Sequence, residues 1–298
     1  MNTSSSHVNL HSFILTGIPG MPDKNPWMAF PLGFLYTMTL LGNGTILAII
    51  KVDQSLHEPM YCFLSILALT DVGLSMSTLP SMLSVFWFNA PEVPFDACIT
   101  QMFFIHSFGE VGSGVLVSMA FDRFVDIRHP LHYASILTHG IIGKTGIAVI
   151  IRAVCVVFPV PFLIKRLPFC HSNACLIRTP VSALVPTWSS SLWGLMPSSF
   201  SYVLILKTVL GIASRAERLK ALNTCLSHIC AVLLFYVPLI GVTIIHRFRK
   251  HLSPVVHTFM TNTYLLLPPL LNPVVYSVKT KQIRRRIILV FQRQKNRV

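Results

Sequence analysis

The stretch GIAVIIRAVCVVFPVPFLI, residues 146–164, contains a single charged side chain, Arg152. A helix needs roughly 20 apolar residues to cross about 30 Å of hydrocarbon. Comparable runs recur along the 298-residue chain, in which 53% of residues are hydrophobic and 11% are charged. Soluble proteins average about 25% charged residues, so a soluble globule of buried helices is disfavoured. The sequence predicts an all-α membrane protein that crosses the bilayer several times.

Seven apolar runs predict a bundle of seven transmembrane helices. The spans are expected near residues 28–50, 60–86, 98–124, 141–164, 184–207, 222–246 and 255–278. The fifth run is the weakest, because residues 181–206 hold seven serines and two prolines. We therefore divide the chain into an N-terminal segment, 1–27, a seven-helix domain, 28–278, and a basic tail, 279–298.

The distribution of basic residues indicates the orientation of the chain. With the N-terminus outside, the inner segments carry 16 lysines and arginines and the outer segments carry 7. Basic residues favour the cytoplasmic side. Two inner loops on the same side also require the weak fifth run to cross. We expect a plasma-membrane protein with an extracellular N-terminus, and a net charge of +14 that faces membrane lipids and not nucleic acid.

Three polar side chains fall in the middle of predicted spans. Asn43, Asp71 and Asn272 belong to the first, second and seventh spans. Polar groups in a bilayer are costly and usually functional. A polar core that joins the three helices would satisfy all of them. Separate local hydrogen bonds are an alternative for either asparagine, but a poor one for Asp71.

The third span ends with Asp122-Arg123-Phe124 at the cytoplasmic face. A neighbouring carboxylate and guanidinium can pair, and the pair can break when a helix moves, which would make a two-state latch. The alternative is simple anchoring of the helix end at the interface. Pro238 and Pro273 remove helix hydrogen bonds in the sixth and seventh spans and can form kinks there.

Several ordered motifs then resemble one family, the odorant (olfactory) receptors among the rhodopsin-like G-protein-coupled receptors. The motifs are GN at 42–43, LHEPMY at 56–61, MAFDRF at 119–124, RHPLHY at 128–133, KALNTCLSHI at 220–229 and PPLLNPVVY at 268–276. Others are similar to the fish-like, class I branch: IH at 105–106, VPLI at 237–240, HRF at 246–248 and KTKQI at 279–283. Members of that branch often bind small, hydrophilic or carboxylic ligands.

The resemblance implies a receptor that performs no covalent chemistry and needs no cofactor or metal. It implies an odorant pocket in the outer half of the bundle, with His106, Thr243 and Arg247 as candidate ligand contacts. Thr243 and Arg247 lie one helical turn apart, and Arg247 could hold a carboxylate. The alternatives are a histidine satisfied in the core and an arginine that extends to the interface.

The resemblance also implies activation of an olfactory-type stimulatory G protein at the inner end. The residues that it assigns to coupling and switching are Asp122, Arg123, Asn272, Pro273 and Tyr276. Asp126, one turn after Arg123, is expected to compete with Asp122 for the guanidinium. Glu110 stands about 200° round the helix from Gly112, near which the family usually carries a glutamate.

The outer segments carry two covalent features. Asn2-Thr3-Ser4 is an acceptor for N-glycosylation. The resemblance pairs Cys98 with a cysteine of the second outer loop, expected to be Cys175, which leaves Cys170 over. Residues 174–200 do not resemble the family, as a deletion with a local change of reading frame would produce. A receptor-like protein with impaired or no signalling is therefore an alternative function.

The basic tail carries apolar residues at a spacing of three to four, at Ile283, Ile287, Ile288 and Phe291. This spacing predicts an amphipathic helix on the inner leaflet. A transporter or channel is a further alternative, but it would need a continuous polar path, and few acids lie in the spans. Catalytic triads, phosphate loops and zinc-binding spacings are not evident, so an enzyme is disfavoured.

Overall fold

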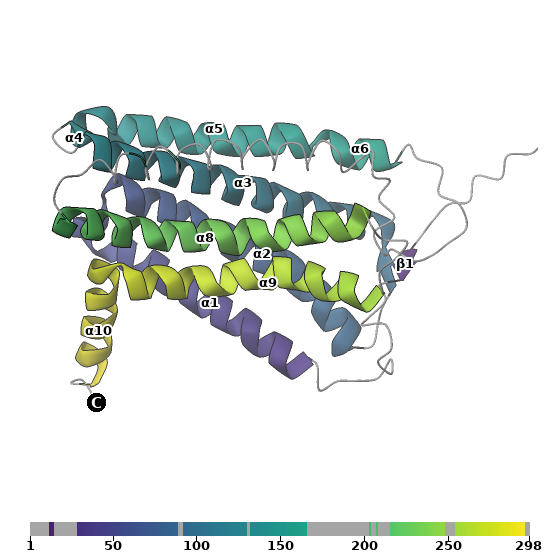
Figure 1. Ribbon diagram of the computed structural model, residues 1–298. Helices are drawn as coiled ribbons and strands as arrows, with labels where there is room; N and C mark the ends of the chain where they lie inside the picture. Colours follow the sequence, from purple (N-terminus) through teal and green to yellow (C-terminus); the bar gives the residue numbers. More distant parts are fainter. Residues whose placement is uncertain are drawn as a thin grey trace, which may run out of the picture.

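The computed structural model consists of long helices lying side by side (Figure 1). The residues that it describes are 12–14, 29–88, 92–129, 132–165, 203, 207, 215–247 and 254–295. The helices are α1, Ala29–Val52; η2, Gln54–Leu56; α2, Pro59–Phe86; α3, Phe95–Arg128; α4, Tyr133–Ile136; α5, His139–Val157; α6, Pro159–Lys165; α8, Arg215–Arg247; α9, Pro254–Lys279; and α10, Lys281–Lys295. The predicted fifth span lies almost wholly outside the described residues.

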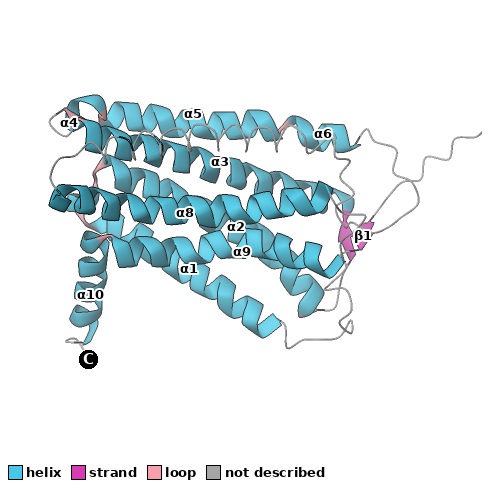
Figure 2. Cartoon of the chain, in the orientation of Figure 1, coloured by secondary structure: helices cyan, strands magenta, loops and turns pink. Residues whose placement is uncertain are grey.

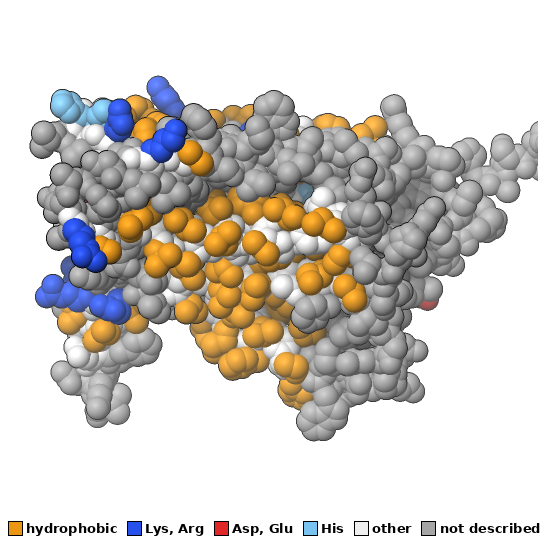
Figure 3. Space-filling view, viewed as in Figure 1, with side chains coloured by type: hydrophobic (Ala, Val, Ile, Leu, Met, Phe, Trp, Pro, Cys, Tyr) orange, Lys and Arg blue, Asp and Glu red, His pale blue; other side chains and the backbone are white. Residues whose placement is uncertain are grey.

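Five stretches of the described helices are long and apolar enough to cross a membrane. They are Phe30–Val52, Pro59–Ser84, Phe95–Arg128, His139–Lys165 and His228–Ile245. Their outward faces are apolar as well. Ile147, Ile151 and Phe158 of the α5 region are 60%, 57% and 56% exposed. Figure 3 shows hydrophobic side chains covering the middle of the bundle, with lysines and arginines near the end that carries α10. Such a surface suits hydrocarbon and not water.

A two-stranded antiparallel sheet adds to the predicted all-α class, which is otherwise confirmed (Figure 2). Strand β1, Ser12–Ile14, pairs antiparallel with β2, Glu92–Pro94, through Ser12 opposite Pro94 and Ile14 opposite Glu92. The pairing attaches a segment before α1 to the connection between α2 and α3. It lies at the opposite end of the bundle from α10.

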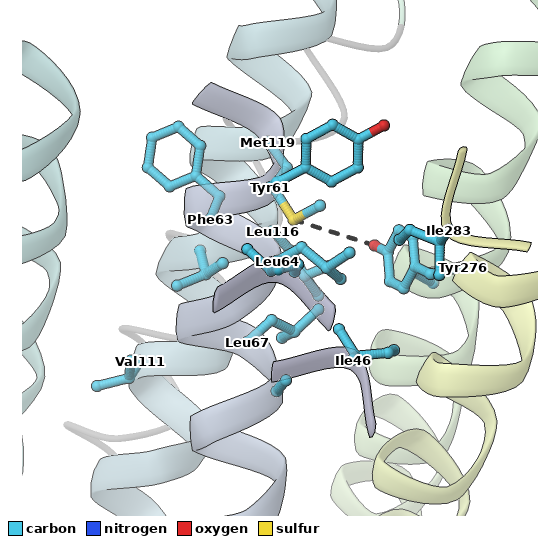
Figure 4. Packing of buried hydrophobic residues seen from close by; sticks show 14 of the residues in the cluster. Ile46, Tyr61, Phe63, Leu64, Leu67, Val111, Leu116, Met119, Tyr276 and Ile283 are labelled. Atoms are coloured by element: carbon cyan, nitrogen blue, oxygen red, sulfur yellow. Dashed lines mark hydrogen bonds between the residues drawn. The ribbon is translucent and has the colours of Figure 1, made fainter. Parts of the chain in front are cut away.

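Helix α3 is the central element, because it packs against α2, α5 and α8. The main core cluster surrounds the half of α3 that ends at Arg128, where Val115, Leu116 and Met119 are nearly inaccessible. Figure 4 shows Leu116 and Met119 together with residues of α1, α2 and α9, among them Ile46 and Tyr276. Packing in the described part of the bundle is therefore tightest toward the end that carries α10.

Helix α10 lies across the end of the bundle at which α9 ends, and several contacts attach it there. Ile283 is fully buried in the main core cluster. The Tyr61 hydroxyl of α2 donates to the side-chain carbonyl of Gln282, and Arg286 pairs with Asp53. A hydrogen bond from the Ser55 hydroxyl is the main reason why the pKa of Asp53 lies below its usual range, and Arg286 adds to the effect. The tail is thus a docked helix.

Replacing Ile283 with alanine should loosen this docking. The change removes buried methyl groups and leaves a cavity, which costs about 2–5 kcal/mol in well-packed cores. We expect a lower melting temperature of the detergent-solubilised protein. Ile288→Ala is the matched control, because Ile288 is 49% exposed on the same helix. Equal melting temperatures for the two variants would contradict the docking role of Ile283.

Candidate functional site

The half of the bundle nearer to α10 contains a polar contact built around Pro273. Proline has no N–H, so it leaves the carbonyl four residues earlier, that of Pro269, without its helical donor. Asn43 of α1 fills this place: its side-chain N–H₂ donates to the Pro269 carbonyl at 2.9 Å and to the Thr39 carbonyl at 3.0 Å. A Cβ placed on Gly42 would lie 3.0 Å from the Pro273 ring. The glycine therefore permits the close approach of α1 and α9.

Asp71 lies beside this contact and bonds to the seventh predicted span. The Asn272 side-chain N–H₂ donates to Asp71 Oδ2 at 2.9 Å, and both residues are 5% exposed. The structure thus brings α1, α2 and α9 together through two neighbouring contacts. Among the described residues, Asn43 bonds to the backbone of α9 and not to Asp71.

The second group lies at the C-terminal end of α3 around Arg123. Its Nε and Nη2 donate to Asp122 Oδ2 at 2.9 and 2.5 Å, and its Nη1 donates to Asp126 Oδ2 at 3.0 Å. Asp122 is fully buried, whereas the Asp126 side chain is 41% exposed. The two carboxylates hold the guanidinium together, so the expected competition between them is not seen in this state. Arg123 is restrained on two sides.

Tyr133 of α4 completes this group, although sequence reasoning gave it no role. Its hydroxyl donates to Asp122 Oδ1 at 2.7 Å. Burial, followed by the nearby Asp122 carboxylate, raises the pKa of Tyr133. The phenol therefore remains a neutral hydrogen-bond donor. Its only sequence signal was its position in the RHPLHY motif that follows α3.

Tyr276 joins the end of α9 to the same region. It is 1% exposed, and its hydroxyl lies 4.0 Å from the sulfur of Met119 (Figure 4). The ring of His228, on α8, lies 5.7 Å from the Tyr276 ring. Three helices, α3, α8 and α9, therefore meet within one helical turn of Arg123. A shift of α8 would act directly on these contacts.

The candidate ligand contacts His106, Thr243 and Arg247 are less closely connected to one another than the residues around Arg123. His106 is a half-buried residue of α3, and the Thr243 hydroxyl donates to the Leu239 carbonyl of its own helix at 2.8 Å. Among the described residues, no hydrogen bond joins His106 to Thr243. Arg247 ends α8, but its side chain lies outside the described residues.

Other predicted features also fall outside the described residues. These are Asn2, Cys170, Cys175 and the altered segment 174–200. Cys98 is placed in the first turn of α3, at the end of the bundle that carries the two-stranded sheet. Of the two cysteines of the expected disulfide, Cys98 lies within the described residues and Cys175 lies outside them.

A further contact between α3 and α8 was not expected from the sequence. The hydroxyls of Ser113 and Tyr236 lie 2.9 Å apart, and both residues are buried. They are separated by 123 residues. Neither belongs to a motif that predicts such a pair, so only folding reveals it.

The described groups form a chain of breakable contacts between helices, and they resemble a conformational switch more than a catalytic centre. A family model described as "Olfactory receptor" matches residues 32–182 and 191–294. The break between these two matches, residues 183–190, falls inside the segment 174–200. Because the model matches the rest of that segment, the prediction that all of residues 174–200 depart from the family is wrong.

Named relatives match nearly the whole chain. Human Olfactory receptor 51H1 is 69% identical over 95% of this chain and 99% of its own length. Human Olfactory receptor 51G2 is 51% identical over 98% of both chains, and mouse Olfactory receptor 51E2 is 44% identical over 97% and 96%. These matches confirm the expected odorant-receptor function at the level of the family, and they confirm that the protein is not an enzyme. The chain belongs to the olfactory receptor family, within the rhodopsin-like G-protein-coupled receptors.

Proposed function

We propose that this receptor binds a small odorant in the outer half of its bundle and activates an olfactory-type stimulatory G protein at its inner end. The observation that carries the proposal is the buried Arg123, held by Asp122 and Asp126 where α3, α8 and α9 meet. A ligand that binds the active arrangement better would shift the equilibrium toward it. Outward movement of α8 would then expose Arg123 to the G protein.

The proposed pocket uses His106, Thr243 and Arg247. His106 and Thr243 lie on facing helices, since α3 packs against α8. Arg247 follows Thr243 by four residues, so the two positions share one face of α8. A guanidinium in a partly dry site binds a carboxylate through strong charge-assisted hydrogen bonds. These features favour a carboxylic odorant.

The polar core is proposed to transmit the change. Asn43, Asp71 and Asn272 connect three helices through side-chain hydrogen bonds next to Pro273. A proline weakens the helix at that point and permits bending. Tyr276, one turn further along α9, contacts the Met119 region that leads to Arg123.

We further propose that the receptor lies in the plasma membrane with residues 1–27 outside and residues 279–298 inside. The docked α10 places basic side chains beside the end of the bundle that holds Arg123, and this end suits the cytoplasmic leaflet. Asn2 would then be glycosylated, and Cys98 would pair with Cys175 across the outer face.

The second candidate function is a receptor that folds but signals weakly or not at all. Two observations favour it: the family match is interrupted between residues 182 and 191, and two carboxylates hold Arg123 at once. Each added ion pair stabilises the inactive arrangement. The two functions predict different responses to the weakening of this latch.

Removing one carboxylate tests the latch. Asp126→Asn should raise basal cyclic AMP by up to about fivefold, because a pair with a partly exposed partner contributes about 1 kcal/mol or less. Asp96→Asn is the matched control, since Asp96 is an exposed acid at the outer end of α3 that pairs with Lys165. Unchanged basal signalling at equal surface expression would argue against the latch.

Removing the proposed ligand anchor tests the pocket. Arg247→Ala should abolish responses to a panel of short carboxylic acids and leave responses to the matching alcohols and surface expression intact. Lys250→Ala, which changes a nearby basic residue, should leave both responses as in the wild type. An unchanged dose–response curve for acids in Arg247→Ala would exclude the carboxylate contact.

Glycosylation tests the orientation. In cells, Asn2→Gln should increase the gel mobility of the receptor as much as enzymatic removal of N-glycans does, because the enzyme that adds the glycan works in the lumen. An antibody should reach an N-terminal tag on intact cells and a C-terminal tag only after permeabilisation. Both tags accessible from the same side would overturn the proposed topology.

A further inference from the structure

Arg152 lies at the centre of a membrane span. It is 13 residues from each end of the span His139–Lys165. At 1.5 Å per residue this is about 20 Å from either end, too far for a side chain to extend to the interface. Arginine is always charged, and an unpaired charge at the middle of a bilayer is strongly unfavourable. The residue therefore needs a partner inside the membrane.

Glu110 of α3 is that partner. Arg152 Nη2 lies 3.3 Å from Glu110 Oε2 and donates to the Glu110 backbone carbonyl, also at 3.3 Å. The Glu110 side chain is 3% exposed and that of Arg152 is 37% exposed. The acid is thus enclosed by protein, whereas the base covers it from the side of the lipid.

Close packing of α3 and α5 brings the two residues within reach. Gly114 lies one turn after Glu110, and Val149 lies one turn before Arg152. A Cβ added to Gly114 would lie 2.6 Å from a Val149 methyl group, so any side chain at this position would force the helices apart. The ion pair between Glu110 and Arg152 therefore depends on the close approach of α3 and α5 that Gly114 permits.

The other side of Glu110 faces aromatic residues of the bundle interior. The Tyr264 phenol of α9 lies within electrostatic reach of Glu110 and of Tyr236 on α8. A Cβ on the neighbouring Gly109 would lie 3.1 Å from the Tyr264 hydroxyl. Glu110 therefore lies near α9 as well as near the helix that carries Arg152. It also lies one helical turn below His106.

We propose that Glu110 and Arg152 are positioning residues: their ion pair seats α5 against α3 at the centre of the membrane and neutralises the charge that α5 carries into the bilayer. Neither residue is expected to touch the odorant or the G protein. The proposal goes beyond the proposed function, because it concerns assembly of the bundle and requires no ligand. It accounts for an acid and a base placed 42 residues apart at the same depth.

A double-mutant cycle tests the pair. Glu110→Gln takes the acid away from the Arg152 charge, and Arg152→Gln takes the base away from Glu110. Each change should lower the surface level of an N-terminally tagged receptor at least about fivefold. The double variant contains neither charge and should recover most of the loss. Arg152→Lys keeps the charge and should also retain much of the surface level. Lys144→Gln, which removes an exposed charge from the same helix, is the matched control and should behave as the wild type.

Two outcomes would overturn the proposal. One is a wild-type surface level in both single variants. The other is a double variant that is no better than the worse single variant, because independent effects do not rescue one another. If the wild type itself stays inside the cell, the same five variants are compared by the melting temperature of the solubilised receptor, with the same expected order.

Discussion

The hydrocarbon interior of a membrane contains no water to satisfy polar groups, and the arrangement of this bundle depends on that constraint. Hydroxyl groups in the spans meet it locally: Thr39, Ser75 and Thr145, for example, donate to carbonyls four residues earlier in their own helices. The side-chain amide of Asn43 makes one such local bond, to the Thr39 carbonyl, and a second bond to another helix. The carbonyl of Pro269 thereby takes a donor from α1, and the Asp71 carboxylate takes one from α9. Each of these two hydrogen bonds joins a pair of helices.

Helix α3 takes part in several further connections between helices. Near its middle it carries Glu110, which pairs with Arg152 of α5, and Ser113, which meets Tyr236 of α8. At its C-terminal end it carries Arg123. Small residues make this possible, since Gly114 admits Val149 to the helix surface. The same helix also carries His106 in the outer half. A ligand that moves α8 relative to α3 would therefore disturb contacts along the whole length of the bundle.

The contacts around Arg123 differ in strength in a way that suits a switch. Asp122 is fully buried and also receives the Tyr133 hydroxyl, whereas Asp126 is partly exposed and bonds to a single nitrogen. Water and salt screen the pair of Arg123 with Asp126 more than its pair with Asp122. In the proposed switch, the Asp122 pair would hold the shape of the helix end, and the Asp126 pair would set how easily Arg123 is released. A receptor with both pairs formed would then have a low basal activity.

The sequence alone determined the all-α membrane fold, the expected orientation and the family. Apolar run length, the asymmetry of basic residues and the ordered motifs are local properties that need no three-dimensional information. It also drew attention to Asn43, Asp71, Asn272 and Arg123, because polar groups in apolar runs are conspicuous. Only the tertiary structure decided their partners: Asn43 bonds to a backbone carbonyl, and Arg123 to two acids at once. The pairing of Glu110 with Arg152 likewise depends on how closely two helices pack, and that distance is set by residues such as Gly114 whose neighbours are known only once the chain has folded.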